Sequence, residues 1–277
     1  MLDPTAPARL SVVALAASGL VLTACQREEA PPPPPAQTAA PEAPAVSVAS
    51  PPVLSRAELL QAMDVAASAY AAGRPAGGDG LAGRRFAVRQ AFGCGGPSPP
   101  SGEDAAGDGV ARWSWGRERR ALQLSLVPGD WSDSPLIAGG ADSWEAAEGF
   151  WLPRPWLRTD GCPGVQGDPL ASGPAAPSPQ TVGLAAVFEE DGSRLDRRNG
   201  RAYSFAVRGE GDQPPAAPTG GYRLVLEGRL TAFADGRAIH CRASSPDQRP
   251  VCIAAAQIDR VAFEDASGAV LSEWRTR

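Results

Sequence analysis

Residues 222–233 read YRLVLEGRLTAF, and residues 251–263 read VCIAAAQIDRVAF. Alternation of apolar and polar side chains is typical of β-strands that bury one face. Between the two stretches, Asp235–Gly236 is a strong two-residue turn signal, and the short stretch 238–242 follows it. After the second stretch, the sequence DASG turns the chain into residues 269–274. The C-terminal third is therefore predicted to be an antiparallel meander of roughly four or five strands.

The same alternation predicts further strands earlier in the chain. They cover residues 85–92, 110–115 and 121–127. In the last of these stretches every second residue from Leu122 to Leu126 is leucine. The short GRER sequence before it predicts a hairpin between the second and third of these strands.

Residues 55–72 predict one amphipathic helix. Ser55 and Glu58 have the spacing of a capping box, and Gly73 supplies a stop signal. Apolar residues recur at intervals of three and four along one face. They are Leu59, Leu60, Met63, Ala66, Ala67 and Tyr70. We expect this face to pack inside the protein rather than against a partner.

Together these patterns predict a mainly β fold with one N-terminal helix (α+β), built from antiparallel sheet in a sandwich-like arrangement. Residues 55–277 are expected to form one globular domain. Residues 163–180 are rich in Gly, Pro and Ser and mark the boundary if there are two domains. The sequence FAVR occurs at 86–89 and again at 205–208, but the flanking residues differ, which favours chance over duplication.

Four cysteines fall in the predicted domain, and four cysteines allow three pairings. We expect Cys94–Cys162 and Cys241–Cys252, because each pair lies within one half of the chain and the second pair would join neighbouring strands. The alternative is that His240 joins the last two cysteines as a metal ligand. No C-x-x-C pattern supports such a site, so neither a metal nor a cofactor is predicted.

A targeting signal stands near the start of the sequence. Residues 10–22 form an apolar run that is too short to span a bilayer, and small residues separate it from Cys25. The sequence LTAC at 22–25 resembles the lipobox of bacterial lipoproteins. The resemblance implies that residues 1–24 are a cleaved signal peptide and that Cys25 carries the lipid. It also implies the periplasmic side of the outer membrane, because Gln26 follows the cysteine where Asp would retain the protein at the inner membrane. The open alternatives are an ordinary cleaved signal peptide and a buried apolar helix with an unrelated cysteine.

Residues 25–54 continue from this cysteine as a Pro/Ala-rich segment that contains the run PPPPP at 31–35. Such a composition buries little apolar surface and favours extended polyproline II structure. We expect a disordered stalk that holds the folded domain away from the lipid.

Composition excludes several classes of site. The 26 basic residues are all arginine, so a Schiff-base lysine, a P-loop lysine and a Ser-Lys dyad are absent. His240 is the only histidine in the sequence, so a metal site with several histidine ligands is excluded. Because Cys241 is its neighbour on a strand, the two side chains should point to opposite faces and form no dyad. The net charge of −5 gives no reason to expect a nucleic acid partner.

The densest aromatic stretch is FWLPRPW at residues 150–156. Trp151, Arg154 and Trp156 are a candidate stacking surface for a glycan or a proline-rich peptide. The alternative is that these rings fill the core, as tryptophan is buried on average. The acidic stretch EEDGSRLD at 189–196 has spaced oxygen donors, but an acidic turn explains it better than a calcium loop does.

These observations predict a lipid-anchored periplasmic envelope protein with a binding or structural role. One alternative is an envelope hydrolase that acts on glycan or peptide with a pair of carboxylates, although no particular pair stands out. The other is a glycan-binding module, for example for peptidoglycan, that uses exposed tryptophans. The predicted partners are a membrane, reached through the acyl chains on Cys25, and an envelope glycan or protein.

Overall fold

The computed structural model describes residues 51–75, 80–98, 107–137, 144, 146–164, 179–189, 196–209, 211 and 213–276. The described residues all belong to one compact unit, Ala49–Arg277. The predicted signal peptide, Cys25 and nearly all of the predicted stalk lie outside the described residues, as does most of the stretch 163–180.

The predicted helix is α1, Arg56–Ala71. The side chain of Ser55 accepts a hydrogen bond from the Glu58 N–H, and the Glu58 carboxylate accepts one from the Ser55 N–H at 2.7 Å. These reciprocal bonds satisfy donors that the first turn leaves free, which confirms the capping box. The helix ends before Gly73, whose φ of 66° suits glycine.

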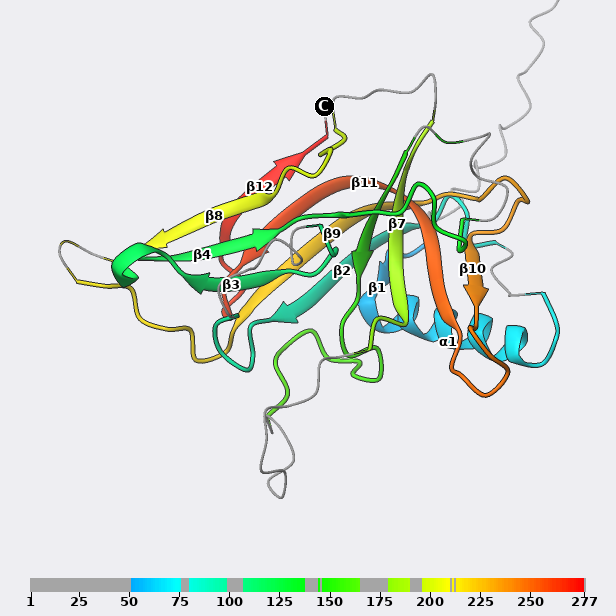
Figure 1. Ribbon diagram of the computed structural model, residues 1–277, viewed down its shortest axis with the longest axis horizontal. Helices are drawn as coiled ribbons and strands as arrows, with labels where there is room; N and C mark the ends of the chain where they lie inside the picture. Colours follow the sequence, from blue (N-terminus) through cyan, green and yellow to red (C-terminus); the bar gives the residue numbers. More distant parts are fainter. Residues whose placement is uncertain are drawn as a thin grey trace, which may run out of the picture. The chain divides into compact units, whose positions relative to one another are not determined.

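Nine of the described strands form one sheet, in the order β1-β2-β9-β11-β7-β6-β5, with β10 and β12 also paired to β11. Their bounds are β1 Leu54–Ser55, β2 Arg85–Phe92, β5 Gly129–Asp130, β6 Ala146–Trp151, β7 Val182–Phe188, β9 Tyr222–Leu230, β10 Ile239–Arg242, β11 Val251–Glu264 and β12 Val270–Arg275. The long, curved β11 is the centre of this sheet (Figure 1). On one edge it pairs first with β10 and then with β9, and on the other edge first with β7 and then with β12.

The predicted meander is correct for two of its hairpins and wrong for the third. β10–β11 and β11–β12 are antiparallel hairpins. β9 and β10 do not pair with each other, because both lie antiparallel to β11, end to end along one edge. The Asp235–Gly236 turn does form, with the Gly236 N–H donating to the Phe233 carbonyl oxygen at 2.8 Å. The turn therefore lies in the connection between β9 and β10, and it does not join two paired strands. The sequence of a turn determines a local reversal of the chain, but it does not determine which strand the chain pairs with afterwards.

A second sheet contains β3 (Arg112–Trp115), β4 (Ala121–Leu126) and β8 (Tyr203–Arg208) in the order β3-β4-β8. The predicted hairpin at GRER joins β3 to β4. One hydrophobic core contains side chains of both sheets and of α1, so the two sheets face each other in a sandwich-like arrangement. The predicted fold class is confirmed: the described part of the chain is mainly β, with one α-helix. Two parallel pairings, β1–β2 and β7–β11, make the large sheet mixed rather than purely antiparallel.

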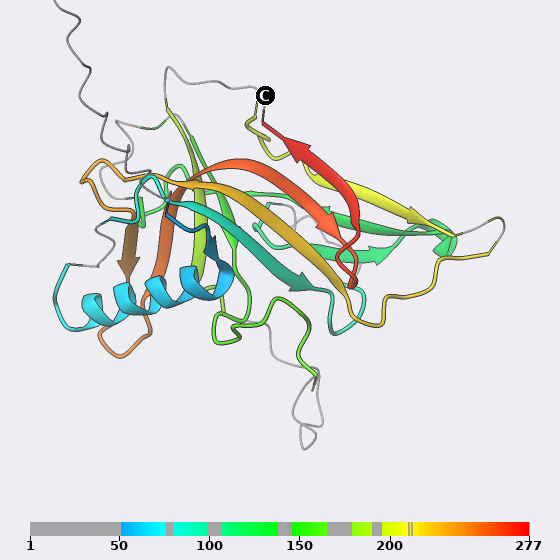
Figure 2. The same ribbon diagram turned by 180° about the vertical axis from the view of Figure 1, so that it is seen from behind.

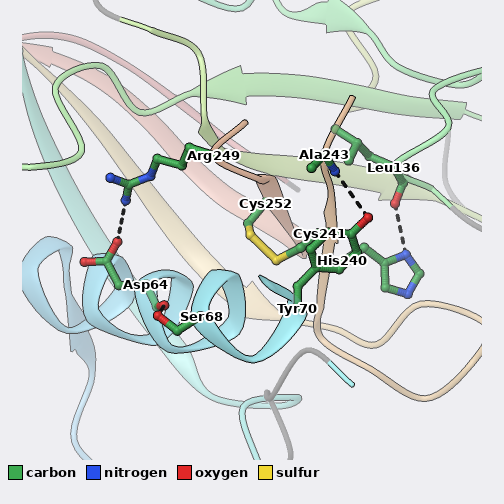
Figure 3. The surroundings of a disulfide bond; sticks show 9 residues. All are labelled: Asp64, Ser68, Tyr70, Leu136, His240, Cys241, Ala243, Arg249 and Cys252. Atoms are coloured by element: carbon green, nitrogen blue, oxygen red, sulfur yellow. Dashed lines mark hydrogen bonds and ion pairs between the residues drawn. A yellow bond between two sulfur atoms is a disulfide. The ribbon is translucent and has the colours of Figure 1, made fainter. Parts of the chain in front are cut away.

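Both predicted disulfides are present. Cys94 is bonded to Cys162, and Cys241 is bonded to Cys252 at directly paired positions of β10 and β11. Figure 3 shows the second disulfide near α1, with the His240 ring directed away from it, as expected for adjacent strand residues.

The loop between β10 and β11 is also tied to α1 (Figure 3). The Tyr70 hydroxyl accepts a hydrogen bond from the Ala243 N–H at 3.3 Å, and Arg249 pairs with Asp64 at 2.8 Å. The disulfide joins the two strands of the hairpin, and these two contacts hold the hairpin on the helix.

Candidate ligand-binding cleft

A cleft of about 470 Å³ opens where one edge of β11 changes partner. On this edge β7 pairs with β11 as far as Ala256, and β12 pairs with it from Arg260 onward. Asp259 lies between these positions. In the pairing with β9, Ile258 lies opposite Gly228 and Arg260 lies opposite Glu227, so Asp259 is the additional residue of a β-bulge. Such a bulge bends a strand and increases its twist. The ends of β7 and β12 therefore flank a notch in the sheet.

The notch takes its lining from both faces of the sheet. Phe188 and Trp274 pack on the main core, whereas Trp144 and Val187 belong to a second cluster on the opposite face. The polar lining consists of Glu148, Glu189, Asp196, Arg198, Tyr203, Thr231, Gln257, Asp259, Arg260, Arg275 and Thr276. Aromatic walls with a few convergent polar groups are typical of sites for small polar ligands.

Glu148 is the most deeply buried carboxylate in the wall of the cleft, with 6 % of its surface exposed. It comes from β6, and its Oε1 accepts a hydrogen bond from the Asn199 N–H at 2.8 Å. Burial raises the pKa of Glu148 above the ordinary carboxyl value, because the loss of water outweighs the donation from the Asn199 and Arg198 N–H groups. The cleft therefore contains an acid that holds its proton at a higher pH than an ordinary glutamate.

Tyr203 and Arg198 lie beside this acid. The Arg198 guanidinium carbon stands 4.4 Å from the centre of the Tyr203 ring, a cation–π contact. Burial, followed by the nearby Glu148, raises the pKa of Tyr203 to about 12. The phenol therefore stays neutral and can donate a hydrogen bond.

Arg260, from β11, also lines the cleft and is 8 % exposed. Its Nη1 donates to Glu227 at 3.0 Å and its Nε donates to Glu273 at 2.9 Å. Burial alone would lower the pKa of Arg260, but these two carboxylates raise it. Its Nη2 has no hydrogen-bond partner among the described residues. Arg260 is therefore a fixed cation in the wall of the cleft, and its Nη2 can donate hydrogen bonds to a ligand.

Two further polar atoms in the wall, Trp144 Nε1 and Thr231 Oγ1, are buried and have no hydrogen-bond partner in the described part of the chain. A buried donor without a partner is costly, and such groups in proteins are usually satisfied by water or by a ligand. Both atoms are thus candidates for contacts with a bound molecule.

The structure does not bring Trp151, Arg154 and Trp156 to this cleft, and their side chains have different surroundings. Trp151 packs on Trp131 with ring centres 4.6 Å apart, in the second core cluster. Arg154 Nη1 donates to the sulfur of Cys94 at 3.4 Å. Trp156 is 56 % exposed. These residues remain a predicted ligand surface, separate from the cleft.

Sequence reasoning missed the cleft because its residues come from β6, β7, β8, β11 and β12. The signals available were weak: Glu148 is a charged residue within an otherwise apolar strand, AAEGFW, and Asp259–Arg260 interrupts the alternation of β11. The acidic stretch 189–196 contributes Glu189 and Asp196 to the lining, although residues 190–195 lie outside the described part.

No family model, curated protein or solved structure was found to match this chain. Within the described residues, no helix is long and apolar enough to cross a membrane. The same residues contain no cluster of three or more His, Cys, Asp or Glu side chains that is arranged to hold a metal ion. The described part of the chain is therefore a β-rich, disulfide-stapled protein with a polar cleft large enough for a small ligand.

Proposed function

We propose that this protein is a non-catalytic binding protein of the bacterial envelope and that its cleft holds part of a glycan. The observation that carries the proposal is the notch between β7 and β12, whose volume of about 470 Å³ falls in the usual range of small-ligand sites, about 300–1,000 Å³. Aromatic rings beside charged and hydroxyl-bearing side chains match the chemistry of a sugar, which offers one apolar ring face and many hydroxyls.

Co-sedimentation with purified peptidoglycan tests this proposal. Thr276 is exposed and lines the cleft, so Thr276→Trp should fill the mouth without disturbing the core. Thr219 is exposed elsewhere, so Thr219→Trp is the matched control. Wild type and the control should pellet with the glycan, and Thr276→Trp should stay in the supernatant. Equal behaviour of all three proteins would contradict glycan binding in the cleft.

One observation favours a second function, hydrolysis of a glycan or peptide. Glu148 is a buried acid with a raised pKa in a cleft that also holds Asp196, Glu189 and Asp259, and such an acid suits proton donation to a leaving group. The test is release of new reducing ends or amines from purified peptidoglycan. Turnover that Glu148→Gln abolishes would replace the binding proposal with an enzymatic one.

The membrane attachment is proposed from the sequence alone. The apolar run, the small residues and Cys25 support a lipid anchor on the periplasmic side of the outer membrane, and the proline-rich residues that follow support a stalk. Cys25→Ala should then leave an unprocessed precursor without lipid. Normal membrane fractionation of that variant would rule the anchor out.

A further inference from the structure

The polar face of the sheet β2-β9-β11 carries a row of three side chains in direct register. Arg85 of β2 is paired with Arg229 of β9, and Arg229 is paired with Gln257 of β11. All three residues are exposed. Their strand neighbours Phe86 and Leu230 face the core, so the row lies on the solvent side. Figure 2 shows β2, β9 and β11 in front of the three-stranded sheet.

The row places two like charges directly opposite each other. Arg229 Nη2 donates to the Gln257 side-chain oxygen at 3.3 Å, and neither arginine has a carboxylate partner among the described residues. Like charges at directly paired positions destabilise a sheet, and here they occur in a chain of net charge −5. The nearest row behaves differently, because Glu227 and Arg260 are paired positions that form an ion pair. The uncompensated pair is therefore a local cationic site.

The row leads into the cleft. Gln257 is a member of the row and also lines the cleft, together with Arg260 and Arg275. Neighbouring strands are about 4.8 Å apart, which puts Arg85 about 10 Å, two strand spacings, from Gln257. A ligand longer than one sugar ring can therefore touch the cleft and the two arginines of the row at the same time.

We propose that the glycan bound by the cleft is acidic and that Arg85 and Arg229 bind its carboxylates while a neighbouring ring occupies the cleft. This inference rests on the proposed function. A guanidinium presents paired N–H donors that match a carboxylate, and two guanidiniums facing each other can share one or hold two. The same arginines could attract any anion. The acidic glycan is favoured because the row is continuous with a ring-sized cleft, whereas a flat lipid surface would leave that cleft empty.

Calorimetry with oligogalacturonate as the acidic probe and a maltooligosaccharide of equal length as the neutral probe tests the inference. The test variant is Arg85→Gln with Arg229→Gln. The control is Arg117→Gln with Arg208→Gln, two exposed arginines outside the row, which gives the same change of net charge. We expect the test variant to lose at least about tenfold in affinity for the acidic probe, since charge-assisted hydrogen bonds contribute about 1.5–3 kcal/mol and about 1.4 kcal/mol is tenfold. The control should lose much less, and added salt should weaken wild-type binding.

The cleft variant Thr276→Trp separates this inference from the proposed function. Loss of binding in both Thr276→Trp and the row variant supports a ligand that spans both places. If wild type binds both probes and only Thr276→Trp weakens this binding, the acidic specificity is overturned and the proposed function stands. If only the row variant weakens binding, the inference is overturned. It is also overturned if the protein binds anionic phospholipid vesicles and does not bind the glycan. If neither probe binds wild type, the acidic-glycan inference is rejected.

Discussion

Arg56 offers the sharpest test of how this fold is held together. It is the first residue of α1, 1 % exposed, at a helix end where a cation is normally unfavourable. Its guanidinium donates to Gln90 Oε1 at 2.8 Å and to four backbone carbonyls of the loop after β6. Those carbonyls belong to Pro153, Arg154, Leu157 and Thr159. One buried cation therefore organises the loop that carries the exposed Trp156.

The magnitude follows from these bonds. Arg56→Met keeps the apolar stem but leaves five acceptors without their donor. At about 1 kcal/mol for each bond the loss is about 5 kcal/mol. The variant also avoids the cost of burying a charge, which lowers the pKa of Arg56 to about 10 in the folded protein. We therefore expect the free energy of unfolding to fall by about 3–4 kcal/mol. Arg56→Lys should lower the free energy of unfolding by about 2–3 kcal/mol, because one ammonium has three donors and cannot reach all five acceptors.

Urea denaturation followed by tryptophan fluorescence measures this loss, and hydrogen exchange over residues 153–159 locates it. Arg74→Met, at an exposed position just beyond the C-terminal end of the same helix, is the control and should change stability by no more than about 0.5 kcal/mol. A loss below about 1 kcal/mol in Arg56→Met, with unchanged exchange in the loop, would refute the idea that this guanidinium organises the loop.

Three further predictions concern the cleft, the helix and the disulfides. Because burial raises the pKa of Glu148 above 4.5, the folded protein binds that proton more tightly than the unfolded chain, so stability falls as the pH rises through the interval between the two pKa values. Urea melts across this range should show a shallower fall in Glu148→Gln, and an unchanged slope would mean that this carboxyl does not titrate as described. Ser55→Ala removes the side-chain half of the capping box and should cost about 1 kcal/mol in thermal unfolding, whereas Ser267→Ala, in the turn before β12, should leave helix content unchanged. Replacing both cysteines by serine should cost about 4 kcal/mol for Cys94–Cys162 and about 3 kcal/mol for Cys241–Cys252, since the loops span 68 and 11 residues; the reverse order in chemical denaturation would contradict the loop-entropy account.

Much of the local structure was determined by the sequence itself. The predicted helix from Ser55 and the strand 85–92 both form, because capping, periodicity and alternation depend on neighbours along the chain. The pairing of Cys241 with Cys252 was also predictable, because a hairpin brings close residues together.

Only the tertiary structure decided how distant strands meet. No local signal shows that β7 would lie parallel to the first half of β11, or that β12 would take over the same edge after Ala256. The cleft exists because of that change of partner, and Glu148, Tyr203 and Arg260 meet there from three strands that do not pair with one another. Strand pairing over long sequence separations is decided by packing of whole faces, which no short window of sequence contains.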